Sequence, residues 1–150
     1  MSNLFSDAKP ILGFFGEYRF LSNYHLCTCV FDGIPFMSSE HVYMYQKSSD
    51  PEYRLSIIRS PTPLQAKKFG SKAELRKDWD TYRTTAMLKA LRAKFANKAE
   101  RDMLLSTGDA HLEETNYWHD TFWGVCDAVG QNMLGRILMN LRNEYRINHN

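Results

Sequence analysis

The stretch Pro35–Lys47, PFMSSEHVYMYQK, joins a turn to the start of a helix and carries several ionisable side chains. Ser38 or Ser39 is suited to cap that helix, because a serine oxygen accepts a hydrogen bond from a backbone N–H of the first turn. The helix then begins with Glu40 and His41. We expect the remaining chain to be organised around this helix.

One face of the helix combines charged and apolar groups. Residues three or four positions apart share a helical face, and this spacing relates Glu40, Tyr43, Met44 and Lys47. The helix dipole favours a first-turn carboxylate by roughly 0.3–1 kcal/mol at an exposed site, which keeps Glu40 ionised and able to stabilise a cation or orient a water. A hydrated Glu40 and a Lys47 that extends along the surface to water produce the same pattern.

Length and composition favour a single soluble domain. A chain of 150 residues buries roughly 70% of its unfolded surface, which is enough for one core. The formal net charge of +2 does not favour a dedicated nucleic-acid binder, which normally has a denser basic face. The sequence has neither a basic-then-apolar leader nor a run of ~18 apolar residues. We therefore expect one domain over residues 1–150, located in the cytoplasm, with no membrane partner and an oligomeric state that the sequence leaves open.

The cysteine content predicts reduced thiols. The chain has three cysteines, Cys27, Cys29 and Cys126, without the spacing of a disulfide framework. His25 lies close to Cys27 and Cys29 in the sequence, but no second pair of ligands follows as in a structural zinc site. We expect no metal and no cofactor.

Short apolar segments predict a small antiparallel sheet. Residues Cys27–Phe31 alternate in polarity and precede Asp32 and Gly33, a typical hairpin turn, with Ile34–Phe36 as the returning strand. Two further strands are expected, in Ile11–Phe15 and Ala110–Asn116.

Helices are predicted over most of the remaining chain. Asp50 is suited to cap one helix, with Pro51 at its first position. Thr62 and Pro63 start another, which ends at Gly70. Apolar periodicity predicts three more helices, over residues 81–95, 99–105 and 131–146. The predicted fold class is α+β, a mostly helical single domain with a small antiparallel β-sheet.

Two further segments combine polar and aromatic groups. Residues Glu17–Tyr24, EYRFLSNY, lack helical or strand periodicity. We expect a loop whose side chains contact a ligand, or whose aromatic residues only cover the core. In Arg76–Asp80 a tryptophan lies between two aspartates, and Asp80 either caps the following helix or contributes to a site.

The segment Asn116–Gly124, NYWHDTFWG, has the densest combination of stacking surface and hydrogen-bonding groups in the chain. A planar heterocycle needs aromatic faces to stack on and polar groups at its edge. The segment therefore predicts a site for such a ligand. A tryptophan-rich core cluster, with its polar groups bonded to backbone, is the alternative.

Several motifs in a common order resemble a known family. The motifs FFGEYRFLSNY, SSEHVYMYQK, DWD, NYWHDTFWG and GQNMLGRILMNLR resemble the YbiA-like proteins of the NADAR superfamily over nearly the whole chain. This resemblance implies a mostly helical α+β domain that hydrolyses the N-glycosidic bond between a ribose carbon and a nitrogenous base, without metal. Members resemble either N-glycosidases acting on phosphoribosylamino-pyrimidine intermediates of riboflavin synthesis or hydrolases that remove ADP-ribose from guanine in DNA.

The resemblance also implies the site residues. Positions that match the family motifs are Glu17, Leu21, Ser22, Asn23, Glu40, His41, Gln46, Lys47, Trp79, Asp80, Asn116, Asp120, Trp123 and Gly124. The chain departs from the family at Met44 and Tyr45, where a smaller or amide residue is more usual, and at His25. These departures bear on the choice of substrate more than on the chemistry.

The bond cleavage itself assigns roles to these residues. It passes through an oxocarbenium-like state, which needs an anion near the sugar. We expect Glu40 in that role, with Asp120 or Asp80 as a second carboxylate. In an alternative route Lys47, with a pKa lowered by an apolar pocket, attacks the anomeric carbon and forms a Schiff base, while Glu40 moves protons.

Recognition of the ligand is expected from aromatic and polar groups. Trp79 and Trp123 would stack on the base, Arg19 and Asn23 would hold phosphate or ribose, and Tyr43 would complete the helix face. The partner is a small ribosylated molecule, with ADP-ribosylated DNA as an alternative. A non-catalytic module that only binds ADP-ribose or another nucleotide has the same requirements. All of these expectations require Glu40 and Trp123 to line one cleft.

Overall fold

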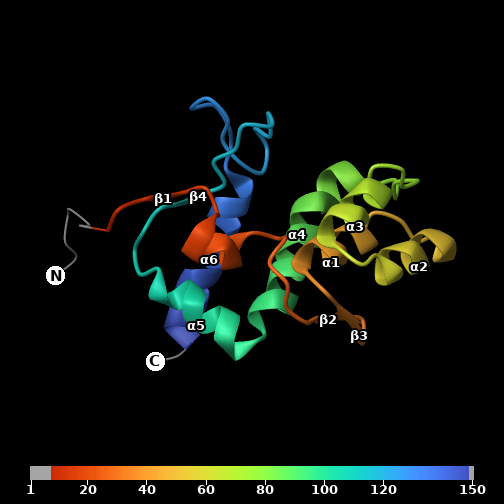
Figure 1. The fold of residues 1–150 in the computed structure, drawn as a ribbon, viewed down its shortest axis with the longest axis horizontal. Helices are drawn as coiled ribbons and strands as arrows, with labels where there is room; N and C mark the ends of the chain where they lie inside the picture. The colour runs from red at the N-terminus through yellow and green to blue at the C-terminus, as the bar shows by residue number, and fades with distance from the viewer. Residues whose placement is uncertain (1–7, 149–150) are drawn as a thin grey trace. The chain divides into compact units, whose positions relative to one another are not determined.

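The computed structural model describes residues 8–148, which form two compact units (Figure 1). Within the described residues, unit 1 comprises residues 8–22 and 99–148, and unit 2 comprises residues 23–98. Helices predominate and the strands are short, as expected for the predicted α+β class. The expectation that residues 1–150 act as one domain stays a prediction.

The hairpin of unit 2 is confirmed. Strand β2 (Cys29–Phe31) pairs antiparallel with β3 (Ile34–Phe36), and Cys29 lies opposite Phe36. Asp32 and Gly33 have φ angles of 51° and 75°. A two-residue hairpin turn of this kind requires positive φ at both central residues, a conformation that aspartate and glycine tolerate.

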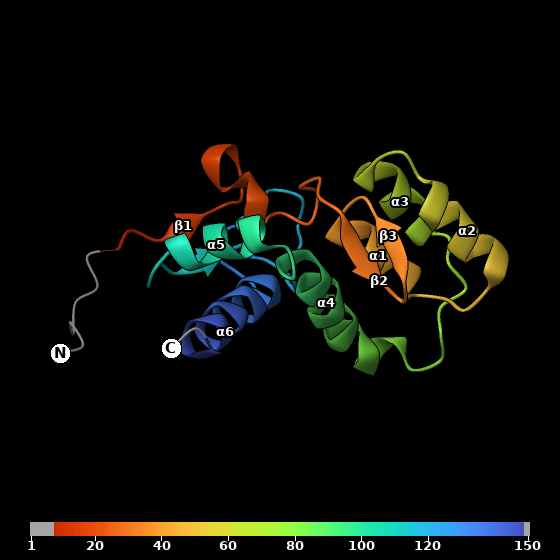
Figure 2. The same ribbon diagram turned by 90° about the horizontal axis from the view of Figure 1, so that it is seen from below.

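Four helices complete unit 2, and the shortest of them lies among the others. Helix α1 (Ser39–Tyr45) packs against α2 (Pro51–Arg59), α3 (Pro63–Gly70), α4 (Trp79–Phe95) and the hairpin (Figure 2). All seven residues of α1 are buried. Helix α1 is therefore stabilised by tertiary packing, since an isolated helix of this length is not stable in water.

Local capping chemistry positions these helices as predicted. Ser38 accepts a hydrogen bond from the backbone N–H of His41, and Asp50 and Thr62 likewise cap α2 and α3. Proline occupies the first turn of both α2 and α3. In each case the cap satisfies a backbone donor that has no partner inside the helix.

Helix α4 begins earlier than predicted. Its N-cap residue is Asp78, not Asp80, and Trp79 is its first residue. The carboxylate of Asp78 makes no capping bond because it pairs with Arg76, at 2.6 Å from the Arg76 Nε. Trp79 is 7% exposed, so burial of its ring fixes the start of the helix, a non-local effect that a capping pattern does not reveal.

Unit 1 differs more from the sequence-based expectation. Strand β1 (Ile11–Leu12) and strand β4 (Leu112–Glu113) are both shorter than predicted. They pair in parallel, so the prediction of an antiparallel sheet is wrong for this pair of strands. The expected loop after β1 is the 3₁₀ helix η1 (Gly16–Leu21). Helices α5 (Lys98–Ser106) and α6 (Met133–Asn148) agree with the prediction within two residues.

The core of unit 1 forms around α6 and β4, which are in contact. Leu104, Leu112 and Leu138 are fully buried. Burial of leucines from α5, β4 and α6 supplies the main stabilisation of such a core, at about 1.5–3 kcal/mol for each side chain.

None of the helices within residues 8–148 combines the length and the apolar character that a membrane span requires.

We predict that Ser38→Ala destabilises the protein by about 1–2 kcal/mol, because the substitution removes an N-cap and leaves a buried imidazole nitrogen without its partner. Urea unfolding measures the change. Ser56→Ala is the matched control, since Ser56 lies inside α2 and its hydroxyl donates to the Glu52 carbonyl one turn earlier, and a change within about 0.5 kcal/mol is expected there. Equal changes in the two variants would contradict the assigned role of Ser38.

Candidate active site

The carboxylate of Glu40 is buried in the first turn of α1. Glu40 is 6% exposed, so the alternative of a hydrated surface glutamate is wrong. Its backbone N–H donates to the carbonyl of Asn23 at 3.2 Å. A buried carboxylate is costly unless nearby charges and donors compensate it. We therefore ask which neighbouring groups interact with the Glu40 charge.

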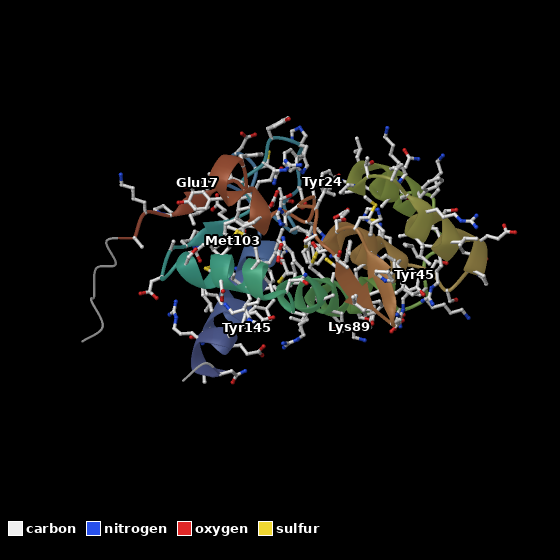
Figure 3. All side chains as sticks on the ribbon, turned by 60° about the horizontal axis from the view of Figure 1, so that its bottom comes forward. Glu17, Tyr24, Tyr45, Lys89, Met103 and Tyr145 are labelled. Carbon is white, nitrogen blue, oxygen red and sulfur yellow. The ribbon has the colours of Figure 1, made fainter. Side chains whose placement is uncertain are left out.

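Two phenols of unit 2 respond to this charge. The pKa of Tyr24 is raised to about 12, first because burial disfavours the phenolate and second because Glu40 repels it. Burial and Glu40 also raise the pKa of Tyr53, in the same order. Figure 3 shows Tyr24 on the segment that leads from η1 to β2. Both phenols stay protonated near neutral pH and can act only as neutral hydrogen-bonding groups.

The amine of Lys47 lies beside two aromatic rings. Its Nζ is 5.8 Å from the ring centroid of Trp79 and 6.0 Å from that of Tyr43, and the two rings are 5.3 Å apart. The pKa of Lys47 is lowered, chiefly by burial; Glu40 opposes this shift and Lys67 adds to it. A lysine of lowered pKa is more often present as the neutral amine, the form that acts as a nucleophile or base.

Gln46 and Asn23 support helix α1 by hydrogen bonds within unit 2. The Gln46 amide donates to the carbonyls of Val42 at 3.1 Å and Ala86 at 2.9 Å, while its oxygen accepts from the Tyr82 hydroxyl at 3.4 Å. The Asn23 oxygen accepts from Ser39 Oγ at 2.8 Å. Both amides, predicted as ligand contacts, hold α1 in place by hydrogen bonds to neighbouring segments.

His41 is likewise engaged on both ring nitrogens. Nε2 lies 2.9 Å from the carbonyl oxygen of Ser60, and Nδ1 lies 2.7 Å from Ser38 Oγ. Because a carbonyl only accepts, Nε2 carries the hydrogen and Nδ1 accepts from the serine. Burial lowers the pKa of His41, although the bond to Ser60 opposes this shift. The neutral imidazole therefore links α1 to the end of α2.

The remaining unit 2 candidate, Asp80, is exposed in the first turn of α4. This position leaves its carboxylate accessible to a ligand and to water. Its predicted role as a second carboxylate stays a prediction.

In unit 1, Asn116 and Asp120 shape the aromatic segment that was predicted as a heterocycle site. The Asn116 amide donates to the Asp120 carbonyl at 2.8 Å and its oxygen accepts from the Asp120 N–H at 3.0 Å. Asp120 Oδ1 in turn accepts from the backbone N–H groups of Phe122 at 3.2 Å and Trp123 at 2.9 Å. These bonds fold residues 116–123 into a closed turn.

Trp123 and Gly124 complete this turn. The Trp123 ring is half-buried and meets Phe122 edge to face, with ring centroids 4.8 Å apart. A Cβ on Gly124 would collide with the carbonyl of Glu114 and with the Asn116 amide, so this glycine is required by packing. The other unit 1 candidates lie at η1: Glu17 and Arg19 are exposed, and Ser22 is its C-cap residue. The expectation that Glu40 and Trp123 line one cleft stays a prediction.

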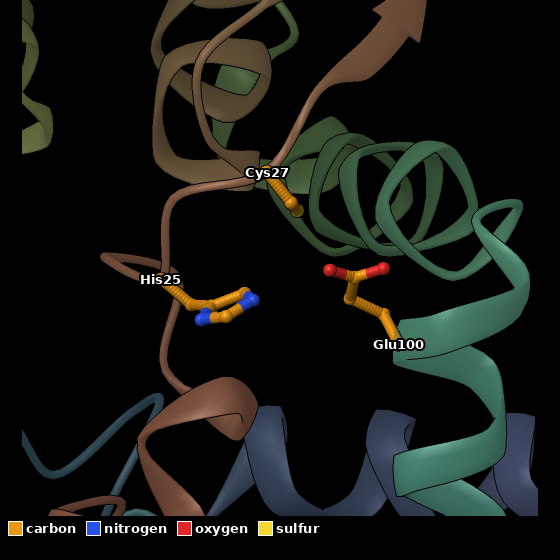
Figure 4. Close-up of side chains that lie close together, drawn as sticks. All are labelled: His25, Cys27 and Glu100. Atoms are coloured by element: carbon orange, nitrogen blue, oxygen red, sulfur yellow. The ribbon is translucent and has the colours of Figure 1, made fainter.

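The cysteines are free thiols. In unit 2 the Sγ atoms of Cys27 and Cys29 are 3.7 Å apart. Figure 4 shows His25 and Cys27 on the segment before β2, and Glu100 on α5 of unit 1. A structural zinc site needs four ligands, and this segment of unit 2 offers three residues of a suitable type, His25, Cys27 and Cys29. The expectation of a site without metal stays a prediction.

Sequence reasoning named Tyr24 only as the last residue of the segment Glu17–Tyr24 and did not connect Tyr24 or Tyr53 with Glu40. Tyr24 directly follows the predicted Asn23, and this adjacency was the available signal. Tyr53 lies on α2, where its hydroxyl donates to the carbonyl of Met44 at 2.5 Å. No local pattern indicates this contact, because it depends on how α2 packs against α1.

Comparison with known proteins identifies close relatives. The NADAR domain family model matches residues 6–146. N-glycosidase YbiA of Escherichia coli (strain K12) is 38% identical over 138 residues, which cover 87% of this chain and 84% of the relative. A riboflavin biosynthesis protein of Vibrio vulnificus (strain YJ016) is 36% identical over 132 residues, covering 85% of this chain and 36% of the relative.

A solved structure also resembles this chain. The NMR structure of the E. coli protein YbiA matches with a TM-score of 0.86 and 34% sequence identity, and the match covers 97% of this chain and 89% of that chain.

We predict that Glu40→Gln lowers the pKa of both Tyr24 and Lys47. Removal of the negative charge takes away one contribution that raises the Tyr24 pKa and the one that opposes the lowering at Lys47. NMR titration of samples labelled at tyrosine Cζ and lysine Cε measures both values. Glu52→Gln, an exposed first-turn glutamate of α2, is the control and should move neither. Unchanged titration in Glu40→Gln would show that the Glu40 carboxylate faces neither group.

Proposed function

We propose that this chain, which belongs to the NADAR domain family and is an N-glycosidase, acts on a phosphoribosylamino-pyrimidine of riboflavin synthesis. The named function of the Vibrio relative supports this choice of substrate. The substrate would be a small molecule met in the cytoplasm. Hydrolysis would release the base and leave the phosphoribose with a hydroxyl group at its anomeric carbon.

The observation that carries the proposal is the buried carboxylate of Glu40 in the first turn of α1, with Lys47 in the turn that follows this helix. The charge of Glu40 acts on the Lys47 amine, and that amine lies beside the rings of Tyr43 and Trp79. A fixed anion and a partly desolvated amine next to an aromatic surface suit a reaction that builds positive charge on a sugar beside a planar base.

In the direct route, Glu40 stabilises the cationic sugar and orients water. The glycosidic C–N bond breaks, and the base leaves with its electron pair and takes up a proton. The oxygen of water bonds the anomeric carbon and loses a proton, which balances the proton gained by the base. The buried position of Glu40 strengthens its interaction with a developing cation, because charges interact more strongly where water is excluded. Asp80 is the candidate in unit 2 for proton donation to the leaving nitrogen.

In the second route, the Lys47 nitrogen bonds the anomeric carbon as the base departs. The sugar ring then opens, its ring oxygen gains a proton, and a protonated imine joins Lys47 to the sugar until water releases it. The lowered pKa of Lys47 favours this route, because the attack requires an uncharged amine. Glu40 would accept and return the protons.

We predict that Glu40→Gln lowers the turnover of the phosphoribosylamino-pyrimidine by roughly 10²–10⁴-fold while the circular dichroism spectrum stays unchanged. Released base, separated by chromatography, is the measurement. Glu52→Gln should keep wild-type turnover. Undiminished release by Glu40→Gln would remove Glu40 from the mechanism.

The same assay compares substrates. DNA that carries ADP-ribosylated guanine is incubated in parallel. If the protein preferentially restores unmodified guanine in this DNA, ADP-ribosylated DNA and not the pyrimidine is the substrate. Binding of both substrates without release of base from either would instead contradict catalysis and indicate a reader of ribosylated ligands.

Borohydride trapping distinguishes the two routes. We predict that reduction during turnover leaves a sugar adduct on Lys47, because borohydride converts a protonated imine into a stable secondary amine. Peptide mass spectrometry locates the adduct. Lys47→Arg should abolish trapping, whereas Lys68→Arg, at an exposed position of α3, should not. Full turnover without any adduct would contradict the amine route and favour direct hydrolysis.

A further inference from the structure

A polar cavity of about 320 Å³ lies within unit 2. Its lining consists of polar or charged side chains, namely Gln46, Ser48, Ser49, Arg54, Arg76 and Asp78. The cavity is built where the chain enters two helices: the serines precede α2, and Arg76 and Asp78 precede α4. None of these residues takes part in the chemical steps of the proposed hydrolysis, and Gln46 supports α1 through its hydrogen bonds.

Contacts with two residues, Ser48 and Tyr45, hold the Arg54 guanidinium in place. Its Nε donates to the carbonyl of Ser48 at 2.8 Å. Its Cζ lies 4.4 Å from the ring centroid of Tyr45, and Nη1 lies 3.5 Å from the hydroxyl of the same residue. A guanidinium packed on an aromatic ring presents its N–H groups in a fixed plane, so less side-chain entropy is lost when it binds a ligand.

The Arg76 guanidinium is fixed in a similar way. Its Nε and Nη2 bond the two carboxylate oxygens of Asp78 at 2.6 and 3.1 Å. Its Cζ lies 3.7 Å from the ring centroid of Tyr82. The backbone N–H of Arg76 donates to the carbonyl of Lys47 at 2.8 Å, which attaches this segment to the end of α1.

The donors of the cavity outnumber its acceptors. A guanidinium has five N–H groups, and the contacts of Arg54 with described residues use two of them. Arg76 likewise keeps N–H groups beyond the two that bind Asp78. The Ser48 oxygen accepts from the Asp50 N–H, so its own hydroxyl hydrogen remains a donor. With two cations and one carboxylate, the cavity suits an anion that has several oxygens.

We propose that this cavity binds a phosphate group, held by the guanidinium N–H groups of Arg54 and Arg76 and by the hydroxyl of Ser48. A phosphate accepts several hydrogen bonds at once and matches the fork of an arginine. A metal cation does not suit the cavity, because two guanidiniums repel it. The proposal goes beyond the hydrolysis and does not depend on it. The phosphate can belong to a sugar phosphate, to a pyrophosphate or to free inorganic phosphate.

Isothermal titration at constant ionic strength tests the proposal. The probes are inorganic phosphate, ribose 5-phosphate and inorganic pyrophosphate, with unphosphorylated ribose as the negative control. We expect all three phosphates to bind and ribose not to bind. The tightest probe then identifies the source of the phosphate. Failure of the wild-type protein to bind any of the three would overturn the proposal.

Variants of α2 separate a specific site from general charge attraction. Arg54→Gln should weaken phosphate binding by roughly tenfold or more, because it removes a charged donor. Arg59→Gln makes the same change of charge at an exposed residue of the same helix and should change the affinity by less than about twofold. Equal effects of the two variants would overturn the proposal. Arg54→Lys keeps the charge without the fork and should also bind more weakly than the wild type.

A measurement on the wild-type protein covers the case in which Arg54 variants fold poorly. Titration with inorganic phosphate, followed by ¹⁵N NMR, should shift the amide signals of Ser48, Ser49 and Arg76. The amide of Arg59 should stay in place. Phosphate-induced shifts confined to other parts of the chain would overturn the proposal regardless of how the variants behave.

Discussion

The burial of the Glu40 carboxylate is the constraint on which the arrangement of unit 2 depends. A charge removed from water costs several kcal/mol unless neighbouring groups compensate it. Glu40 belongs to a helix whose residues are all buried, so hydration cannot supply that compensation. The phenols of Tyr24 and Tyr53 and the amine of Lys47 all respond to its charge. The same neighbours define the electrostatic environment in which Glu40 would act in the proposed reaction.

Polar residues on the same helix and at its C-cap act largely as internal supports. Gln46 joins α1 to α4 through the Ala86 carbonyl, and His41 joins α1 to the end of α2 through the Ser60 carbonyl. Rigid support of this kind keeps catalytic groups close to a productive geometry, which is worth more to a reaction than an additional flexible contact. Residues such as these can match a family motif because they position α1, and their predicted ligand contacts stay predictions.

Lys47 connects the proposed chemistry with the arginine-lined cavity. Its amine lies beside the rings of Tyr43 and Trp79, while its carbonyl accepts from the backbone of Arg76. The cations of Lys47 and Arg76 interact with different carboxylates. Lys47 is partly desolvated and responds to Glu40, whereas Arg76 is paired with Asp78. A lysine of lowered pKa suits covalent chemistry, and a permanently charged guanidinium suits recognition of an anion.

The sequence by itself determined the helix caps and the hairpin turn, because these features depend on residues that are adjacent in the chain. The caps at Ser38, Asp50 and Thr62 and the turn at Asp32 and Gly33 follow from short-range hydrogen bonding and backbone preference, which a pattern of residue types expresses directly. The family motifs also identified N-glycosidase chemistry. Only the tertiary structure decided features that join distant segments.

Those distant features include the parallel pairing of β1 with β4 and the start of α4 at the buried Trp79. They also include the burial of Glu40, which changed a helix-end glutamate into a charge that shifts the pKa of its neighbours. Burial and pKa depend on which surfaces meet in three dimensions. The local order of residues does not contain that information.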